Sequence, residues 1–251
     1  MSEQKVVLVT GASGHLGAAI ARACAEDGYA VAVHYRSGSQ SAEALVAEIA
    51  GRGGTAQAFA ADLATEAKGA MSLVTAVIDR FGRLDGVINN SADQTPVHFA
   101  ELDDEKWQDM LQTSLLSATR VTSAALPVLH QGGAVVNISS VEAAVAFPNH
   151  AHYAAAKAAL ESFTRSLALE LAPRGMRANA IAPGLIERDG LAEAWPQGHT
   201  WWTASAPAGR PVTAEEVAQA VTFLIGPRAG GINGVVLPVD GGWSASARAP
   251  F

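Results

Sequence analysis

TGASGHLG, residues 10–17, joins an apolar run at residues 6–10 to a segment with helical spacing of apolar residues at 16–27. Its glycines let the backbone turn sharply and approach a ligand closely. A helix N-terminus behind such a loop offers free N–H groups and a positive dipole end, which together favour a bound phosphate. We therefore expect residues 10–17 to hold the phosphates of a dinucleotide.

Outward from this loop, short β-branched runs alternate with longer Ala-rich segments. The runs predict strands at residues 6–10, 30–34, 55–60, 87–89, 134–139, 177–181 and 235–239. Apolar periodicity predicts helices at residues 16–27, 41–52, 66–81, about 104–129, 153–171 and 214–225. Such alternation is typical of βαβ units with right-handed crossovers. The predicted fold class is α/β, with a single doubly wound parallel sheet of about seven strands and helices on both faces.

Size and composition limit the possible kinds of protein. The 251 residues fit one domain spanning residues 1–251, and 49% apolar content supports a large core. Seventeen Lys and Arg against 24 Asp and Glu give a net charge of −7, which argues against a nucleic-acid partner. No apolar run is long enough to span a membrane, and the N-terminus lacks the features of a signal peptide, so we expect a cytoplasmic protein.

Cysteine and histidine usage gives no sign of a metal site. Cys24 is the single cysteine, which excludes an intrachain disulfide and a cysteine-based zinc site. His150 and His152 resemble a metal motif, but no third ligand follows at a fixed spacing. We therefore predict no metal and assign this pair to a substrate loop or to the surface.

The end of the second predicted strand indicates which dinucleotide is bound. A site for a ribose 2′-hydroxyl usually carries an Asp or Glu here, but residues 34–37 read His-Tyr-Arg-Ser and the first acid is Glu43. Arg36 and Ser37 would donate charge-assisted hydrogen bonds to a 2′-phosphate, which a carboxylate would repel. We predict NADP(H) as the cofactor; the alternative is that Arg36 is a solvated loop residue.

Three residues form a candidate catalytic group. Tyr153 and Lys157 are four apart and share one face of a predicted helix. Lowering the pKa of a tyrosine by about 3 units takes roughly 4 kcal/mol, and a neighbouring ammonium is the simplest source. Ser140 lies at the carboxyl end of the fifth predicted strand, where open α/β sheets bind ligands. Its hydroxyl can hydrogen-bond a substrate carbonyl or alcohol oxygen.

Several motifs together resemble the short-chain dehydrogenase/reductase family, and the resemblance covers nearly the whole chain. They are the glycine loop, Asn-Asn-Ser-Ala at 89–92, Tyr-Ala-Ala-Ala-Lys at 153–157, Pro-Gly at 183–184 and Val-Asp-Gly-Gly at 239–242. The resemblance implies a Rossmann-type fold and reduction of a ketone by hydride transfer. It also implies that Tyr153 gives or takes the proton, that Ser140 orients the substrate, and that Lys157 adjusts the tyrosine and binds the nicotinamide ribose.

The resemblance implies further cofactor-binding positions at loops that follow the strands. Asp62 corresponds to a residue beside the adenine, with a helix cap as the alternative, and Ile186 to one whose backbone meets the carboxamide. Asn89 resembles a residue that lines the cofactor, with a purely structural role as the alternative. The expected set is Gly11, Ser13, His15, Leu16, Gly17, His34, Tyr35, Arg36, Ser37, Asp62, Leu63, Asn89, Ser91, Ala92, Tyr153, Lys157, Pro183, Gly184 and Ile186.

Two departures from the family pattern leave other functions open. His15 replaces a glycine, as a basic residue does in the pteridine reductases, and residues 34–37 also resemble that branch. That branch carries an Asp where this chain has Ser140, so we prefer ketone reduction and keep a pteridine or cyclic-imine C=N reductase as the alternative. Ser114 falls where the family has a helix asparagine that completes the proton relay. A cofactor-binding protein with impaired catalysis is therefore a third hypothesis.

Residues 187–211 lose periodicity and hold three of the five tryptophans. Their place between the sixth strand and the last helix predicts a lid over the nicotinamide. The aromatic residues favour a small carbonyl substrate that is planar or aromatic, and packing at a subunit interface is the alternative. The resemblance implies a homotetramer, and closed symmetry is common among soluble chains.

Overall fold

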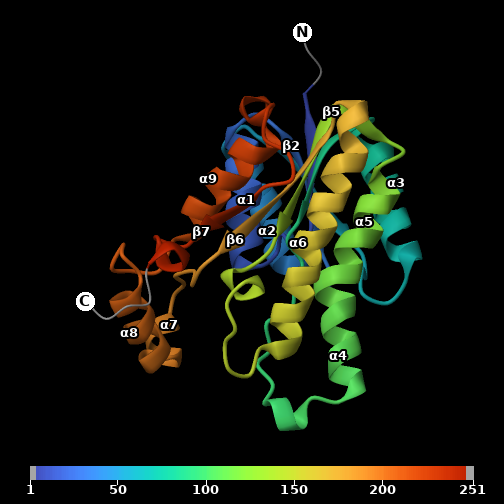
Figure 1. Ribbon diagram of the computed structural model, residues 1–251. Coiled ribbons are helices and arrows are strands. Elements are labelled where there is room, and N and C mark those ends of the chain that lie inside the picture. The colour runs from blue at the N-terminus through green and yellow to red at the C-terminus, as the bar shows by residue number, and fades with distance from the viewer. Residues whose placement is uncertain (1–3, 247–251) are drawn as a thin grey trace.

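A seven-stranded parallel sheet forms the centre of the computed structural model, which describes residues 4–246, with strand order β3-β2-β1-β4-β5-β6-β7 (Figure 1). The predicted fold class is confirmed. Residues 1–3 and 247–251 of the predicted domain lie outside the described residues. The strands are β1 (Val6–Val9), β2 (Ala30–Tyr35), β3 (Thr55–Ala60), β4 (Leu84–Asn89), β5 (Leu129–Ile138), β6 (Arg177–Pro183) and β7 (Val236–Val239).

Helices cover both faces of this sheet (Figure 1). One face carries α1 (His15–Glu26), α2 (Ser39–Gly51) and α9 (Ala214–Ile225). The other carries α3 (Ala67–Phe81), α5 (Ser117–Ala125) and α6 (Ala151–Leu171), with α4 (Asp104–Leu111) leading into α5. The short elements are η1 (Phe99–Glu101), η2 (Gln112–Leu116), η3 (Val141–Ala143), η4 (Ala172–Arg174), α7 (Leu191–Ala194), α8 (Pro196–Ser205), η5 (Pro227–Ala229) and η6 (Trp243–Ala245).

The sequence of β1 explains why both faces are covered. All four of its residues are apolar and buried. Because strand side chains alternate, Val7 and Val9 pack with α1 and α9, whereas Val6 and Leu8 pack with α3 and α6. A continuous apolar run is what a parallel strand needs when helices lie on both sides.

The strand order places a ligand crevice at the carboxyl end of β1. β1 pairs with β2 on one side and with β4 on the other, so the chain crosses in opposite directions from this point. Open α/β sheets bind ligands at such a reversal. Residues 10–17 follow β1 and lie in this crevice.

Three predicted elements differ from the structure. β4 begins at Leu84, before the predicted residue 87, and a register shift against β5 lies between Leu84 and Gly86. The helix predicted at 104–129 is interrupted by η2, one π-helical turn, and ends at Ala125. β5 begins at Leu129, a start that the polar residues 130–133 conceal in the sequence.

The fourth difference lies in residues 187–211, which contain α7 and α8 rather than an irregular loop. Pro196 opens α8 at a position where a proline costs no hydrogen bond. Glycine and polar residues between its tryptophans hide the helical pattern. No helix within residues 4–246 is long and apolar enough to cross a membrane.

Candidate active site

The glycine loop is held in place from behind. Gly11 has φ +63°, and its N–H donates to His34 Nδ1 at 3.0 Å. Asn90 Nδ2 donates to the carbonyls of Thr10 and Gly11 at 3.0 and 3.2 Å. A Cβ on Gly17 would lie 2.3 Å from the Gly11 oxygen, so the loop and α1 approach too closely for any side chain there. These contacts fix the loop without using the first N–H groups of α1.

The start of α1 fits the phosphates of a dinucleotide. Its N-cap, Gly14, provides no side-chain cap, and no acidic residue lies in the first turn. The first N–H groups of a helix have no acceptor inside the helix. Ser13 precedes this turn and Leu16 lies within it, as expected for residues that line a phosphate. The donors and the positive end of the helix dipole therefore suit an anion here.

The end of β2 fits a 2′-phosphate. Arg36 and Ser37 are exposed, and no ion pair joins Arg36 to another residue within the described chain. Tyr35 is partly buried against the core. A free guanidinium and a hydroxyl beside the glycine loop are suitable donors for a phosphate monoester.

The side chain of His34, a predicted cofactor residue, is turned into the protein. Its side chain is buried, and its two ring nitrogens meet Gly11 N–H and the Ala61 carbonyl, the latter at 3.1 Å. Burial lowers its pKa, which favours the neutral ring that accepts from Gly11 and donates to Ala61. His34 therefore positions the loop instead of presenting its ring to the cofactor.

The side chains of Leu63 and Asn89, two further predicted cofactor residues, are also buried. The Leu63 side chain is buried in the core beside α3, so only its main chain is left to meet a ligand. Asn89 Nδ2 donates to Thr122 Oγ1 at 3.0 Å and to Asn137 Oδ1 at 2.8 Å inside the protein. The structural alternative for Asn89 is therefore the one its contacts support.

The remaining expected cofactor residues lie along the carboxyl edge of the sheet. Asp62 is exposed and accepts from Ala64 N–H at 2.8 Å; it does not cap α3, whose N-cap is Glu66. Ser91 donates its N–H to Thr10 Oγ1 at 3.0 Å, and Ala92 beside it is exposed.

Beyond β6, the chain continues along the same edge. Pro183 ends the strand, and Gly184 lies so close to Trp202 that a Cβ would approach its ring to 2.4 Å. Ile186 forms a parallel bridge with Val212. These contacts fix the backbone of residues 183–186, the stretch expected to meet the nicotinamide.

Ser140, Tyr153 and Lys157 come together at the carboxyl end of β5. Ser140 caps η3, and its Oγ accepts from Glu142 N–H at 3.2 Å. Lys157 Nζ lies 5.6 Å from the centre of the Tyr153 ring and donates to the Ile138 carbonyl at 2.7 Å. The Tyr153 and Lys157 side chains are both buried, so this part of the site is largely shielded from water.

Burial shifts the pKa values of Tyr153 and Lys157 in opposite directions. Burial raises the pKa of Tyr153 and Glu142 raises it further, whereas hydrogen bonding with Ser140 and Gln94 acts to lower it. Burial lowers the pKa of Lys157 to about 8. Burial has the largest effect on the pKa of Tyr153, and the amine expected to lower that pKa donates to the Ile138 carbonyl. That the ammonium lowers the pKa of Tyr153 stays a prediction.

Ser114 lies in the π-helical turn η2 and is buried. Its Oγ is 3.4 Å from Asp93 N and 3.3 Å from Met110 Sδ. Within residues 4–246, its hydrogen bonds do not reach Tyr153 or Lys157. The side chain ties the loop after β4 to the helix, and π turns are frequent at functional sites.

His15 connects the glycine loop to residues 187–211. Its Nε2 lies 2.9 Å from the Glu187 carbonyl, and the Glu187 carboxylate meets His199 Nε2 of α8 at 3.1 Å. Residues 187–211 stand beyond the carboxyl edge of the sheet (Figure 1). Glu187 therefore links α1 to the predicted lid.

Two of the three tryptophans of the predicted lid pack within the chain. Trp202 stacks on Trp243 with ring centres 5.0 Å apart, and Trp201 packs edge-on against both rings. Phe147, from the loop after Ser140, contacts Trp201 and Trp243. This aromatic cluster joins the lid segment, the loop after β5 and the end of the described chain.

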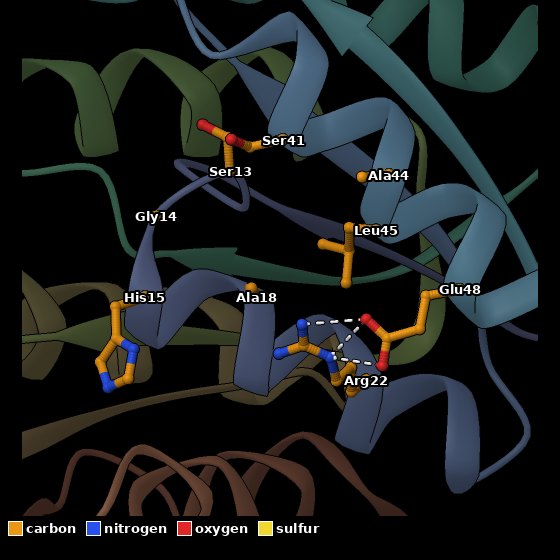
Figure 2. A pocket seen from close by; sticks show the side chains of 9 residues that line it. All are labelled: Ser13, Gly14, His15, Ala18, Arg22, Ser41, Ala44, Leu45 and Glu48. Carbon is orange, nitrogen blue, oxygen red and sulfur yellow. Dashed lines mark hydrogen bonds and ion pairs between the residues drawn. The ribbon is translucent and has the colours of Figure 1, made fainter. Parts of the chain in front are cut away.

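A cavity of about 370 Å³ lies between α1 and α2, beside the glycine loop (Figure 2). The Arg22–Glu48 ion pair, 2.9 Å apart, borders it, while His15 points away from Ser13 and Ser41. Neither Ser140 nor Tyr153 lines this cavity. We therefore do not assign it to the substrate.

Asn90 and Thr10, both within motifs quoted from the sequence, hold the glycine loop. His150, assigned from the sequence to a substrate loop or to the surface, contacts Tyr153 and Glu142. The sequence interpretation missed Glu142 and Gln94, which act on Tyr153 and which no sequence pattern connects to it. No three His, Cys, Asp or Glu side chains gather as a metal site in the described part of the chain.

Comparisons with known proteins agree with this geometry. A family model described as enoyl-(acyl carrier protein) reductase matches residues 11–244. An uncharacterized oxidoreductase of Methylorubrum extorquens is 38% identical over 96% of this chain and 98% of its own length. The 3-oxoacyl-[acyl-carrier-protein] reductase FabG of Staphylococcus aureus is 34% identical over 96% of this chain and 99% of its own.

Solved structures also resemble this chain over nearly its whole length. A short-chain dehydrogenase/reductase from Serratia marcescens superposes with a TM-score of 0.91 at 32% identity, covering 97% of this chain and all of the other. A blue fluorescent protein from a metagenomic library, in complex with NADPH, gives a TM-score of 0.89 at 31% identity, covering 96% and 98%.

Proposed function

This chain belongs to the short-chain dehydrogenase/reductase family and is an oxidoreductase that acts on carbonyl or hydroxyl groups, and on that basis we propose that it reduces a ketone to an alcohol with NADPH. The observation that carries the proposal is the grouping of Ser140, Tyr153 and Lys157 at the carboxyl end of β5. A hydroxyl donor, a buried phenol and an amine in one dry site suit proton transfer to a carbonyl oxygen.

Each of these residues has a separate role in the proposal. Bound NADPH supplies the hydride. Ser140 donates its hydroxyl hydrogen to the substrate oxygen, while one lone pair of its Oγ accepts from Glu142 N–H. Tyr153 transfers its proton to that oxygen as negative charge develops there. Lys157 provides a positive charge beside the resulting phenolate, whose pKa burial alone would keep high.

Burial keeps the Tyr153 phenol protonated at neutral pH, so the proton is present before the reaction. The raised pKa also makes the phenol a weaker acid. Its acidity increases when a neighbouring ammonium stabilises the phenolate. The same residues run the reverse reaction when the tyrosine acts as the base.

Replacing Tyr153 tests the reaction. Tyr153→Phe removes the proton donor and keeps the ring, so we expect kcat to fall by about 10²-fold or more. NADPH affinity, measured by fluorescence titration, is expected to stay within about threefold of the wild-type value. Turnover at the wild-type rate in this variant would refute the mechanism.

The preference for NADP(H) rests on the exposed Arg36 and Ser37 and on the absence of a carboxylate from residues 34–37. The solved relative in complex with NADPH supports this choice. We propose that Arg36 pairs with the 2′-phosphate. Arg36→Ala is then expected to raise the KM for NADPH about tenfold or more and to leave that for NADH nearly unchanged. Equal changes in the two KM values would count against this role.

We further propose that the substrate is a small molecule and that the chain forms a homotetramer. The outward face of α6 carries Leu169, which is 78% exposed, and small residues such as Ala155 and Ser162. A flat face of this kind can pair with the same face of a second copy across a two-fold axis.

A further inference from the structure

We propose that His150, held by Glu142, binds a second, neutral oxygen of the substrate, so that the site prefers hydroxyketones and dicarbonyl compounds to unsubstituted ketones. This inference rests on the proposed carbonyl reduction and specifies the substrate class for the same site. It assigns a binding role to two residues that lie outside the Ser140, Tyr153 and Lys157 group.

The first observation is the position of the His150 ring. Its centre lies 5.8 Å from the centre of the Tyr153 ring, with the two planes 68° apart. His150 comes three residues before Tyr153, immediately ahead of α6. A group bound at the Tyr153 hydroxyl would therefore have this imidazole as a near neighbour.

The second observation is that only one of the two ring nitrogens is occupied. His150 Nδ1 lies 2.8 Å from Glu142 Oε2, and both side chains are largely buried, 23% and 16% exposed. Nε2 has no hydrogen-bond partner among residues 4–246. The carboxylate accepts from Nδ1–H and fixes the ring. Nε2 is left free: it accepts from a substrate hydroxyl when the ring is neutral and donates to a substrate oxygen when the ring is protonated.

The third observation concerns Glu142, which connects this histidine to Ser140. Its backbone N–H donates to Ser140 Oγ at 3.2 Å, while its carboxylate holds His150. Glu142 thus positions both the Ser140 hydroxyl and the His150 ring next to Tyr153. The hydrogen bond to Glu142 also raises the pKa of His150, which keeps both ring nitrogens protonated to a higher pH.

The turn immediately before His150 is held by a main-chain hydrogen bond. Asn149 has φ +65°, a left-handed conformation that asparagine adopts more readily than most residues, and its carbonyl accepts from Val97 N–H at 2.8 Å. The contact with Val97 joins this turn to the loop after β4.

The charge of the His150–Glu142 pair determines whether it favours a neutral oxygen or a carboxylate of the substrate. The negative Glu142 offsets the positive charge of the imidazolium, so the pair provides direction without a net charge. A carbonyl or hydroxyl oxygen accepts from such a donor without bringing a second negative charge close to Glu142. A carboxylate bound there would leave this largely buried site with one net negative charge, and its desolvation costs more than that of a neutral oxygen.

The test compares matched substrates with NADPH as the reductant. We use 2,3-butanedione and 2-butanone, which differ in the second oxygen, and 2-oxobutyrate, which carries a carboxylate instead. The quantity measured is the ratio of kcat/KM for the dione to kcat/KM for butanone. Because the dione is intrinsically more reactive, the change in this ratio between variants is the readout.

His150→Phe keeps an aromatic ring beside Tyr153 and removes the donor. We expect the ratio to fall about tenfold or more, with the KM for the dione rising, and His150→Gln to restore part of it through its amide donor. His130→Phe, a matched change at an exposed histidine at the start of β5, is expected to leave the ratio unchanged. An unchanged ratio in His150→Phe would overturn the proposal.

Two further outcomes keep the proposal open to refutation. If His150→Phe does not fold, as judged by circular dichroism, Glu142→Gln is the deciding variant, and a wild-type ratio in it would refute the role of the pair. Faster reduction of 2-oxobutyrate than of the dione would refute the neutral oxygen. If the wild type reduces none of these ketones, the proposed function itself fails, and Tyr153→Phe then has no activity to remove.

Discussion

The buried amine of Lys157 serves the proposed reaction but lowers the stability of the folded protein. Its side chain is buried, and its pKa falls from an ordinary value of 10.5 to about 8. That difference corresponds to about 3 kcal/mol for keeping the ammonium in a dry site. The hydrogen bond to the Ile138 carbonyl offsets only part of it. Groups that the reaction needs are often retained in this way although they lower stability.

We predict that Lys157→Met is inactive but more stable than the wild type. Methionine fills the space without a charge, and the lost bond to Ile138 costs about 1 kcal/mol, so the net gain near pH 7 is about 2 kcal/mol. Thermal unfolding at pH 7, followed by circular dichroism, measures the change. A lower Tm in the variant would show that burial of this amine is not destabilising.

The pH dependence of stability provides the control. Between pH 8 and 10 the unfolded chain keeps the lysine proton that the folded chain has released, so the unfolded state binds more protons and stability rises with pH. Through this pH window the free energy of unfolding of the wild type is expected to rise relative to that of Lys157→Met. The difference in stability between the two proteins is therefore expected to shrink. A constant difference would contradict the lowered pKa.

Residue types and spacing predicted which side chains belong to the site but not the direction each one faces. Tyr153, Lys157 and Ser140 gather as expected, because helix spacing and strand ends fix where they lie. His34 and Asn89 turn inward, and strand alternation could not show this because both faces of the sheet are covered. His34 bonds to the backbone of the glycine loop and of Ala61, and Asn89 Nδ2 donates to two side chains inside the protein.

The strand–loop–helix unit around residues 10–17 depends on close backbone approach. The loop turns at Gly11, and Gly17 of α1 lies directly against it. Asn90 and His34 connect the unit to β4 and β2. The element is therefore rigid before any ligand binds, which lowers the cost of ordering a phosphate site.

We predict that Gly17→Ala impairs cofactor binding. The added Cβ would meet the Gly11 oxygen at 2.3 Å and force the loop away from α1, a change that typically costs about 1–3 kcal/mol. NADPH affinity is expected to fall about tenfold or more, and Tm to fall with it. Fluorescence titration and thermal unfolding measure the two effects.

Gly14→Ala is the matched control. Gly14 has φ −85°, and a Cβ added there would lie at an ordinary 3.4 Å from the Gly11 oxygen. We expect a small loss, because alanine is a weaker N-cap than glycine. Equal effects in the two variants would show that close packing is not what the loop requires.

Element boundaries were predicted best where apolar periodicity is uninterrupted. The helix at 214–225 and the strand at 55–60 match the structure. The start of β5 and the helices α7 and α8 could not be predicted, because polar residues and glycines break their patterns. Contacts with neighbouring elements form these segments, and those contacts are not visible in local sequence.

At the scale of the whole molecule, the sheet order determines which loops meet. The loops after the parallel strands all reach the carboxyl edge of the sheet, and the proposed site draws residues from those after β1 to β6. Alternating strands and helices predicted this arrangement, since parallel strands place their carboxyl ends together. The link from His15 through Glu187 to His199 was not predictable, because it joins residues that are far apart in the chain.

We predict a solution mass of about 103 kDa, four times 25.8 kDa. Leu169→Glu places a charge on the outward face of α6 and is expected to lower the mass to that of a dimer or monomer. Met71→Glu alters a similarly exposed residue on α3 and is expected to leave the mass unchanged. Analytical ultracentrifugation measures all three proteins, and a monomeric wild type would refute the tetramer.

The most direct test follows a labelled hydride. The protein is incubated with NADPH that carries deuterium at both C4 positions of the nicotinamide and with a ketone substrate, and the product is examined by mass spectrometry and NMR. We predict an alcohol with one deuterium on the carbinol carbon, formed by the wild type and not by Tyr153→Phe. Recovery of unreacted ketone with intact labelled cofactor, or of an alcohol without deuterium at that carbon, would contradict carbonyl reduction by this chain.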